Sequence, residues 1–585
     1  MRKTLAIILS VAMLLSIVVI GASAYERPES EIKKITTEAE FLAMEPNGYY
    51  SIENDLTLTK TYEQPFSGEI YGKNHKITLS APMFEDFNGG ICDLTLEGKI
   101  TASKQDVGAV ARKSSAPNGE DITFLNITVN VEIEITDVEV TKVDANNNPT
   151  DIGGGKYAGG LLGFGDKYAN LKFINCKNTK SVTNSSVLVN YSSEDNVTKG
   201  INFNVYAGGI VGRCYRAEFR FCENSGNITS KANRGGAAGI AANAGYGGGT
   251  YDVDTYDCIN TGDITSNYDA GGMFAYLGSS GNRVDTYYLV RCANYGTIKG
   301  GYRVGGMFGY SYATGSSTNA YWTLEGCVSI GDVYGGLPAY ADKSVGEIFV
   351  GLLTGYSNSC YNTYRNCFAQ GNLRLNEGAA DKDEAGTLKF FRCVLGCSSA
   401  KVMTMPIENL YICDYGTTEY YTYATAAKNA EQVIPFDQAR EGVKRCTEDE
   451  IANVVTTLNT ALNGLAQDAN EQDVLVVNNG KVEFDATKRA ARLAADKTDI
   501  MIVTTTEEIE DTDTESEEGD NTTTEAVPTS EKPNNNTTKP SENNTTAAPS
   551  PNEGGCAGCG GFTAVAALAA VLVGSAAFVV VKKKF

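Results

Sequence analysis

A degenerate repeat within residues 156–371 constrains the fold of this chain more than any other feature of its sequence. The phrase Cys-x-Asn-x-Gly-x-Ile begins at Cys222, Cys258 and Cys292, and less regular copies begin at Cys176, Cys327 and Cys367. The six cysteines are 46, 36, 34, 35 and 40 residues apart. A nearly constant period with insertions of varied length is typical of a solenoid, in which each repeat forms one coil.

A second, glycine-rich phrase lies between the cysteine phrases. It reads Gly-Gly-x-x-Gly from Gly159, Gly208 and Gly305, and it loses its last glycine at Gly271 and in Gly239-Ile-Ala-Ala242. Both phrases are short, rich in apolar or β-branched residues and interrupted by Gly and Asn, which favours strands joined by tight turns. A repeat of roughly 30–35 residues with two or three such strands fits one coil of a parallel β-helix.

Stacking of the coils predicts two internal ladders. Neighbouring coils lie about 4.8 Å apart in a parallel sheet, so equivalent residues of successive repeats form columns. We expect one column of buried cysteines and one column of amides hydrogen-bonded from coil to coil. The members are Cys176, Cys222, Cys258, Cys292, Cys327 and Cys367, and Asn178, Asn224, Asn260 and Asn294. The glycine two residues after each asparagine is expected to supply a positive φ.

The 15 cysteines admit a second interpretation, which is a disulfide or metal framework. We favour free thiols in the ladder, because parallel side chains on stacked strands do not converge as a disulfide requires. Free cysteine is also a common buried residue. Cys360, Cys393 and Cys397 are better candidates for pairing, and Cys556-x-x-Cys559 has redox or zinc spacing without a second pair.

The two phrases resemble the GLUG repeats of bacterial surface proteins. The resemblance rests on Gly-Leu-Leu-Gly163 and Gly-Ile-Val-Gly212, each followed by the asparagine–glycine phrase. Residues 66–79 are also similar to the first coil of such proteins. Over residues 35–460 the family implies a right-handed parallel β-helix on a secreted cell-surface chain, often an adhesin. It implies no catalytic residues.

Composition excludes several kinds of function. The 585-residue chain has a formal net charge of −22, which argues against a nucleic-acid partner because phosphate binding needs clustered Lys and Arg. His75 is the only histidine in the chain. A zinc site of the metalloprotease type needs at least two histidines, and no partners for a Ser-His-Asp triad are recognised around His75. We therefore expect His75 to have a structural role.

The two ends of the chain predict export and membrane anchoring. Residues 1–24 combine Arg2 and Lys3, an apolar run and a small-residue cleavage site, as a signal peptide does. Residues 504–561 are rich in Thr, Asn, Pro and acidic residues without apolar periodicity, which predicts a disordered stalk. Residues 562–585 contain an apolar stretch long enough to span a bilayer, followed by a lysine tail that stays cytoplasmic. We expect a single-pass protein on the extracellular face, similar to Gram-positive surface proteins but without a Leu-Pro-x-Thr-Gly motif.

Three further segments lie between these ends. We expect an N-terminal cap (25–65), a β-helix (66–400) and a C-terminal region of strands and a capping helix (401–503). Thr37 and Glu40 form a capping box before a short helix, which we expect to cover the first coil. Thr447 and Glu450 form a second box before an amphipathic helix, which resembles the helix that closes GLUG-type domains.

A group of carboxylates is the main candidate for chemistry. Asp252, Asp254, Asp257 and Asp263 crowd near one coil. Two carboxylates facing a groove could act as acid and base on a polysaccharide, or bind Ca²⁺ through oxygen ligands. The alternative is that strand alternation points them outward as solvated charges. We expect a protein without enzymatic activity or a cofactor, with Ca²⁺ binding as the alternative.

Tyrosine is unusually abundant, with 32 residues, many of which are concentrated between Tyr246 and Tyr364. An aromatic face packs on sugar rings and a phenol hydroxyl adds hydrogen bonds, although packing at coil edges is the alternative role. We select six candidate ligand-binding residues: Tyr256, Tyr287, Tyr288, Tyr302, Tyr310 and Trp322. The sequence thus predicts adhesion to a glycan or to a host or microbial surface protein. A polysaccharide lyase or hydrolase and a ligand-free envelope spacer are the alternatives.

Overall fold

The computed structural model describes residues 29–496 with internal gaps. The gaps are 104, 117–118, 120, 137–155, 187–203, 233, 249–251, 281–284, 315–319, 337–347, 359–360, 378, 380–389, 394–396, 399–406, 414–420, 426–432 and 436–440. The predicted signal peptide, stalk and membrane anchor lie outside these residues. Within the described residues, no helix is both long enough and apolar enough to cross a membrane.

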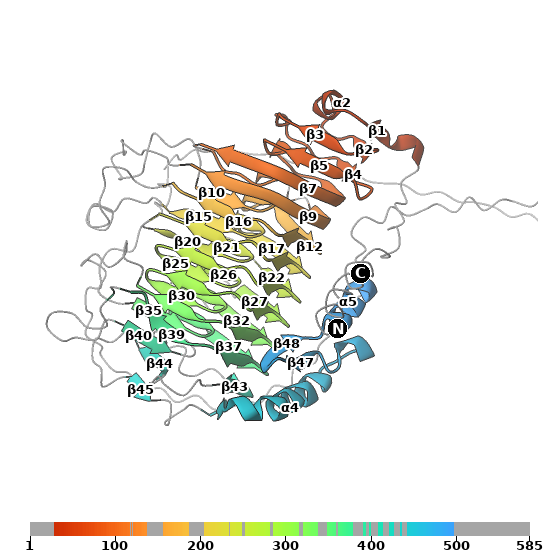
Figure 1. Cartoon of the computed structure of the whole chain (residues 1–585). Coiled ribbons are helices and arrows are strands. Elements are labelled where there is room, and N and C mark those ends of the chain that lie inside the picture. The colour runs from red at the N-terminus through yellow and green to blue at the C-terminus, as the bar shows by residue number, and fades with distance from the viewer. Residues whose placement is uncertain are drawn as a thin grey trace, which may run out of the picture. The chain divides into compact units, whose positions relative to one another are not determined.

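Two long sheets, parallel apart from one antiparallel pair near the C-terminal end of the smaller sheet, wind into a β-solenoid (Figure 1). In the described residues the larger sheet has 28 strands and the smaller has 18. A regular coil contributes two strands to the smaller sheet and then three to the larger sheet, and each strand pairs in register with its equivalent one coil later. The predicted parallel β-helix is therefore confirmed, and its right-handed winding stays a prediction.

The N-terminal elements form the first coils. They are η1 (Glu29–Glu31), β1 (Lys33–Ile35), α2 (Glu38–Leu42), β2 (Tyr49–Ile52), β3 (Leu56–Leu58), β4 (Glu69–Tyr71), β5 (Lys76–Leu79), β6 (Phe84–Asp86), β7 (Gly90–Ala102), β8 (Ala111–Ser114) and β9 (Asp121–Ile135). Both halves of the predicted capping box are present, because Thr37 accepts from the Glu40 amide and Glu40 accepts from the Thr37 amide. Phe41 of α2 packs into the core against Phe84 at 5.3 Å between ring centres.

The later coils are built from short strands. The smaller sheet continues with β10 (Tyr157–Gly159), β11 (Leu162–Gly165), β15 (Val205–Gly208), β16 (Val211–Cys214), β20 (Gly235–Ala238), β21 (Ala241–Gly248), β25 (Asp269–Gly271), β26 (Phe274–Ser280), β30 (Arg303–Gly305), β31 (Phe308–Thr314), β35 (Ile348–Gly351), β36 (Thr354–Asn358), β40 (Phe390–Cys393), β41 (Cys397–Ser398), β44 (Tyr421–Thr425) and β45 (Val433–Pro435). The larger sheet continues with β12 (Asn170–Ile174), β13 (Lys177–Asn178), β14 (Val182–Asn184), β17 (Arg216–Arg220), β18 (Glu223–Asn224), β19 (Ile228–Ser230), β22 (Val253–Tyr256), β23 (Ile259–Asn260), β24 (Ile264–Ser266), β27 (Asp285–Val290), β28 (Ala293–Asn294), β29 (Ile298–Gly300), β32 (Ala320–Glu325), β33 (Val328–Ile330), β34 (Val333–Gly335), β37 (Tyr361–Arg365), β38 (Phe368–Gln370), β39 (Leu373–Leu375), β42 (Ile407–Glu408), β43 (Leu410–Cys413) and β46 (Val443–Cys446).

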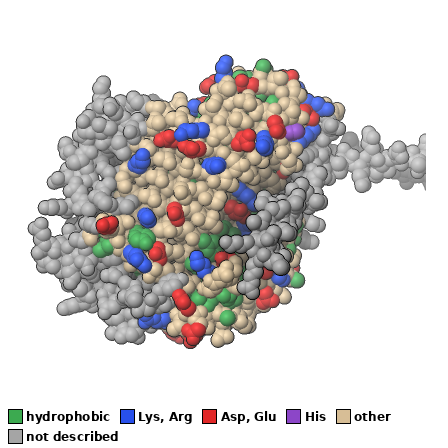
Figure 2. Space-filling view, in the orientation of Figure 1, with side chains coloured by type: hydrophobic (Ala, Val, Ile, Leu, Met, Phe, Trp, Pro, Cys, Tyr) green, Lys and Arg blue, Asp and Glu red, His purple; other side chains and the backbone are tan. Residues whose placement is uncertain are grey.

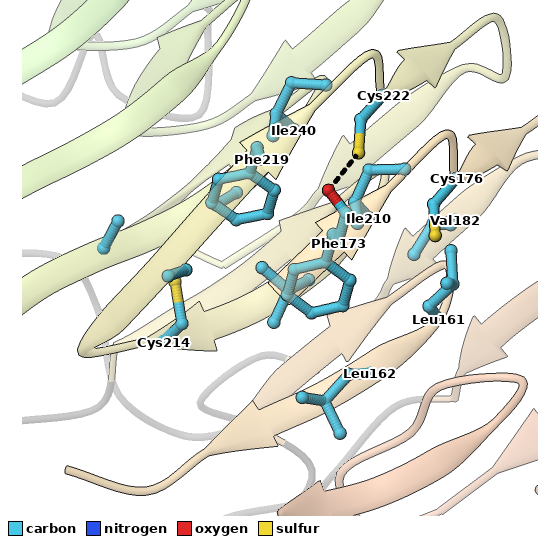
Figure 3. Packing of buried hydrophobic residues seen from close by; sticks show 14 of the residues in the cluster. Leu161, Leu162, Phe173, Cys176, Val182, Ile210, Cys214, Phe219, Cys222 and Ile240 are labelled. Atoms are coloured by element: carbon cyan, nitrogen blue, oxygen red, sulfur yellow. Dashed lines mark hydrogen bonds between the residues drawn. The ribbon is translucent and has the colours of Figure 1, made fainter. Parts of the chain in front are cut away.

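The core is a set of columns of like residues. Phe124, Phe173 and Phe219 stack through three coils at 4.7 and 5.1 Å between ring centres. The six cysteines of the repeat are fully buried beside them, and each thiol donates to a backbone carbonyl, as Cys222 does to Phe173 at 3.3 Å (Figure 3). These thiols act as small apolar side chains whose weak donor is satisfied.

The asparagines form an amide ladder. Asn178, Asn224 and Asn260 each donate to the amide oxygen of the next asparagine at 2.7 Å, ending at Asn294. The same amino groups donate to the carbonyl two residues further along their own chain, as Asn224 does to Gly226 at 2.9 Å. Because both hydrogens of each buried amide are used, the ladder compensates for its own desolvation.

The two sequence phrases meet at this ladder. The second glycine of each Gly-Gly pair lies against the asparagine: a Cβ on Gly209 would come within 2.6 Å of the Asn224 amide and 2.0 Å of the Gly239 carbonyl oxygen. A Cβ on Gly239 would come still closer to Asn260, at 2.4 Å from its amide oxygen. The Gly-Gly pair and the asparagine therefore recur together because they are in direct contact.

The expected positive φ after each asparagine was wrong for Gly226, Gly262 and Gly296. Their φ values lie outside the left-handed region, and they are glycine because a Cβ would approach the carbonyl of the preceding coil, at 2.0 Å for Gly262. The left-handed residue is instead the one before the cysteine, as at Asp257 (φ 55°) and Arg291 (φ 53°). Gly331 and Gly371 do have positive φ.

Residues 447–496, here named the arm, follow the last coil. The arm contains η6 (Glu448–Glu450), α4 (Ile451–Asn463), η7 (Ala469–Glu471), β47 (Leu475–Asn478), β48 (Lys481–Phe484) and α5 (Ala486–Ala495). The second predicted capping box is present at Thr447 and Glu450. The buried face of α4 packs on the outer face of the larger sheet. A role of this helix in closing the last coil, which the resemblance implies, stays a prediction.

The position of α4 is explained by a row of outward-facing side chains at equivalent positions of the larger sheet. Across successive coils this row reads Lys177, Glu223, Ile259, Ala293, Val328, Phe368 and Tyr411. The buried side chains of α4, such as Leu458, form a second apolar cluster with Ala293, Val328 and Phe368, separate from the solenoid core. Burial of one leucine of this kind stabilises the arm by about 1.5–3 kcal/mol.

Candidate binding groove

The arm is fixed to the solenoid by a buried ionic cluster around Asp257. Arg291 donates to this carboxylate from Nε at 3.2 Å and from Nη2 at 3.0 Å. Arg492 of α5 donates to it from Nε at 3.1 Å and from Nη2 at 2.5 Å. Only 2% of the Asp257 side chain is exposed. Two guanidinium groups on one buried carboxylate give charge-assisted bonds of fixed geometry.

Arg489 extends the contact to neighbouring coils. Its guanidinium donates to the backbone carbonyls of Phe221 and Asp257, both at 3.0 Å, and pairs with Glu223. Burial alone would raise the pKa of Glu223, yet Arg489 and Lys177 hold that pKa below its usual range. Arg220 of β17 forms an ion pair with Asp496, just after α5.

A groove lies between the arm and the outward face of β17, β22 and β27. Its main cavity has a volume of about 410 Å³ and is lined by Glu218, Arg220, Tyr256, Glu471, Arg492 and Asp496, among others. A second cavity of about 290 Å³ shares Tyr256, Arg291 and Glu471 with the first and extends toward Leu465. Figure 2 shows acidic and basic side chains interspersed over the visible face of the molecule.

Carboxylates beside the groove keep unused acceptors. Oδ1 of Asp254 and Oδ2 of Asp496 are buried and have no hydrogen-bond partner among the described residues. Burial, together with Asp252 and Glu218, raises the pKa of Asp254 to about 6. Burial also raises the pKa of Asp496, helped by Glu218 and Asp257. Because both oxygens are buried without a hydrogen bond, the ionised form of each carboxylate is disfavoured.

Two of the six predicted aromatic residues belong to the core. Tyr287 and Trp322 are fully buried and stack at 5.1 Å between ring centres, and the Tyr287 hydroxyl donates to the Gly278 carbonyl at 2.8 Å. Both rings point inward, because strand alternation places them in the same column as Val253. They therefore offer no face to a ligand, and their assignment to a binding surface is corrected.

Two others surround a buried arginine on the outside of the smaller sheet. Arg303 forms an ion pair with Asp269 at 2.5 Å, and its guanidinium lies 3.3 Å from the centre of the Tyr310 ring and 4.9 Å from that of Tyr302. Tyr310 is buried and Tyr302 is half-buried. Their ring faces are occupied by a cation–π contact rather than open to a sugar.

Of the remaining two, Tyr256 lines the groove and Tyr288 lies near Tyr256 without lining either cavity. Tyr256 is half-buried and lines both cavities, and Tyr288, next to Asp254 in register, is 42% exposed. Burial raises the pKa of Tyr256, helped by Asp254 and Glu218, so its phenol stays protonated and can donate. The structure thus brings together two of the six predicted residues.

The four predicted aspartates do not converge. Asp257 is held by arginines, and Asp263 is exposed and accepts from the Thr297 amide of the next coil at 3.0 Å. Asp252 and Asp254 lie on β22 or beside it, facing outward. In the described part of the chain, no group of three His, Cys, Asp or Glu side chains is placed to hold a metal ion.

Sequence reasoning missed the arm's contribution to the groove. Arg489 and Arg492 are three residues apart, which places them on one face of a helix that begins after the Asp485 N-cap. That spacing was visible in the sequence, but it did not indicate a carboxylate partner more than 200 residues away.

Comparisons with known proteins leave the family open. No protein-family description matches the chain, and no curated protein matches it. Among solved structures, the chain is similar to a crystal structure from Bacteroides ovatus provisionally named an immunoglobulin A1 protease. The TM-score is 0.26 at 14% identity, over 79% of this chain and 94% of that one. A likeness of this degree carries no information about the activity of the present protein.

Proposed function

We propose that this protein binds a glycan in the groove between the larger sheet and the arm, as a surface protein that mediates adhesion. The observation that carries the proposal is the cavity of about 410 Å³, in which Tyr256 lies beside arginines and carboxylates. Carboxylates accept from sugar hydroxyls, guanidinium groups donate to them, and a tyrosine ring packs against the apolar face of a sugar.

Features of the sequence support display outside the cell. The predicted signal peptide, acidic stalk and membrane anchor would hold the solenoid above the membrane. The resemblance to GLUG repeats points the same way. We assign the partner as a glycan rather than a protein, because the groove is a narrow polar cavity and not a broad apolar face.

A binding screen tests the proposal. The full-length protein is applied to a glycan array and to a panel of matrix proteins, once with Ca²⁺ and once with a chelator. We expect saturable binding to a subset of glycans that survives the chelator. Binding to matrix proteins alone would contradict the assignment of a glycan. If a sample that is folded, as judged by a β-rich circular dichroism spectrum, binds no glycan and no matrix protein, the result would favour the alternative of a ligand-free envelope spacer.

A second assay addresses the enzymatic alternative. Each bound polysaccharide is incubated with the protein, and new reducing or unsaturated sugar ends are measured. We expect none, because an adhesin holds its ligand without cleaving it. The assay is needed because carboxylates of the solenoid and of the arm line the same groove, as Glu218 and Glu471 do, and a facing pair could act as acid and base. Release of sugar ends at a constant rate would replace adhesion with a lyase or hydrolase.

A further inference from the structure

Two cysteines near the end of the solenoid differ from all those of the ladder. Cys413 ends β43 and Cys446 ends β46, and the two are direct register partners in neighbouring parallel strands. The ladder itself stops before them. The register of β38 with β43 opposes Phe368 to Tyr411 and Gln370 to Cys413, so Cys413 stands in a different column.

The surroundings of the pair also differ from those of the ladder. Cys413 and Cys446 belong to the apolar cluster under α4, whereas Cys292, Cys327 and Cys367 belong to the solenoid core. Ladder thiols donate to backbone carbonyls, as Cys327 does to Leu289 at 3.3 Å. In the described residues neither Cys413 nor Cys446 donates to a carbonyl, and each thiol interacts with the other. Ladder thiols also interact with their neighbours, but they are held by carbonyl bonds as well.

The geometry of the two strands allows a covalent bond. Register partners in a parallel sheet have Cα atoms about 4.8 Å apart, inside the range of about 4.4–6.8 Å found in disulfides. Ladder cysteines such as Cys292 and Cys327 lie just before a strand, and their thiols are held by hydrogen bonds to backbone carbonyls of the preceding coil. Cys413 and Cys446 are each the last residue of a strand, and among the described residues no hydrogen bond to a carbonyl holds either thiol, so the two Sγ atoms can turn toward each other.

We propose that Cys413 and Cys446 form a disulfide that joins the last two strands of the larger sheet beneath α4. The reaction is exchange with a small-molecule disulfide. The Cys413 thiolate attacks one sulfur of that disulfide, forms a mixed disulfide and releases one thiolate. Cys446 then loses its proton and attacks the Cys413 sulfur, which releases the second thiolate. Two protein thiols are oxidised, and one external disulfide is reduced to two thiols.

The order of attack follows from the proton shared by the pair. The hydrogen bond from Cys446 lowers the pKa of Cys413 below that of an ordinary thiol, which makes Cys413 the first of the two to lose its proton and attack. Export, as the signal peptide predicts, would place the pair in a compartment where such bonds persist. The closed disulfide would tie β46, whose one partner among the described strands is β43, to the rest of the sheet.

Peptide mapping tests the proposal directly. The folded full-length protein is incubated with oxidised glutathione, the remaining thiols are alkylated in denaturant, and the chain is digested with trypsin without reduction. Cleavage after Lys401, Lys428, Arg445 and Lys481 isolates each cysteine in its own peptide, 402–428 and 446–481. We expect these two peptides to be joined, and to separate on reduction.

The ladder supplies a matched control in the same digest. Cys292 and Cys327 fall in peptides 292–299 and 304–343, each with a single cysteine, and we expect both to be alkylated and unlinked. The Cys446→Ala variant should lose the 402–428 crosslink, and its unfolding temperature should no longer rise on oxidation as that of the wild type does. Recovery of both Cys413 and Cys446 as alkylated peptides after oxidation of wild type would overturn the proposal. Links among the ladder peptides instead would overturn it equally.

Discussion

Asp257 links the solenoid to the arm through two ion pairs. It sits in the left-handed turn before Cys258, where its carboxylate faces Arg291 of the next coil and Arg492 of α5. Both partners are largely buried, with side chains 19% and 5% exposed. Removal of one member of a buried ionic cluster leaves the others uncompensated, so a small change here has a large effect.

The Asp257→Asn variant should therefore be strongly destabilised. We expect the free energy of unfolding in urea to fall by about 3 kcal/mol, because the two guanidinium groups keep their burial and lose their charge partner. The exposed Asp263→Asn is the matched control and should change it by less than about 0.5 kcal/mol. Equal stability of wild type and Asp257→Asn would show that the arm is not held by this cluster.

Asp254 should make stability depend on pH. An unfolded aspartate has a pKa near 3.9, whereas the folded value is about 6. The folded protein then binds the proton more tightly, so this group lowers stability as pH rises from about 4 to about 6, and its unfavourable effect is complete above that range. Asp254→Asn should raise the unfolding temperature at pH 7 relative to wild type and have little effect at pH 4. A larger gain at pH 4 than at pH 7 would contradict the raised pKa.

At the scale of elements, the coil is defined by contact between the two sequence phrases. The strands, their period and the two ladders could be predicted from sequence, because each repeat restates the same small set of residues at Cys222, Asn224 and Gly226. The contact of Gly209 with Asn224 could not be predicted, because the two motifs do not show which of their residues lie opposite each other across a coil. The left-handed position was also missed, since Phe221, Asp257 and Arg291 share no residue type.

The Gly209→Ala variant tests the contact between the phrases. Its Cβ would lie 2.0 Å from the Gly239 carbonyl oxygen, so the coils must separate or the ladder must shift. We expect a loss of about 2 kcal/mol or more in urea unfolding. Gly464→Ala, whose Cβ would meet nothing closer than 3.3 Å at the end of α4, should be neutral or slightly stabilising. A neutral Gly209→Ala would mean that the coil packing described here is wrong.

The packing of α4 on the larger sheet could not be predicted from any single repeat, because the residue between Cys and Asn follows no pattern within one repeat. The strand register shows that this position changes from Glu223 to Ile259 and then to Val328 and Phe368. Such a row of outward-facing apolar side chains is stabilised when the apolar face of a helix buries it. We expect Leu458→Ala, at a fully buried position of α4, to lower the free energy of unfolding by about 2–5 kcal/mol. Leu465→Ala, 57% exposed, should change it by less than about 0.5 kcal/mol. Similar effects of the two variants would argue against α4 packing on the solenoid.

At the scale of the whole molecule, the groove exists because segments distant in sequence come together. Tyr256 and Glu218 come from the solenoid, whereas Glu471, Arg492 and Asp496 come from the arm. The tyrosine surplus indicated the right stretch of chain but not the right residues. Tyr287 and Trp322 are buried in the core, and Tyr302 and Tyr310 are in cation–π contact with Arg303.

The measurement that tests the central claim most directly is calorimetric titration of a glycan found in the array screen into three folded proteins: wild type, Tyr256→Ala and Tyr168→Ala. Tyr168 is the matched control, because it is 53% exposed and does not line either cavity of the groove. The groove predicts an affinity about tenfold weaker for Tyr256→Ala, and wild-type affinity for Tyr168→Ala. Wild-type affinity in Tyr256→Ala would contradict the account and place the ligand elsewhere on the molecule.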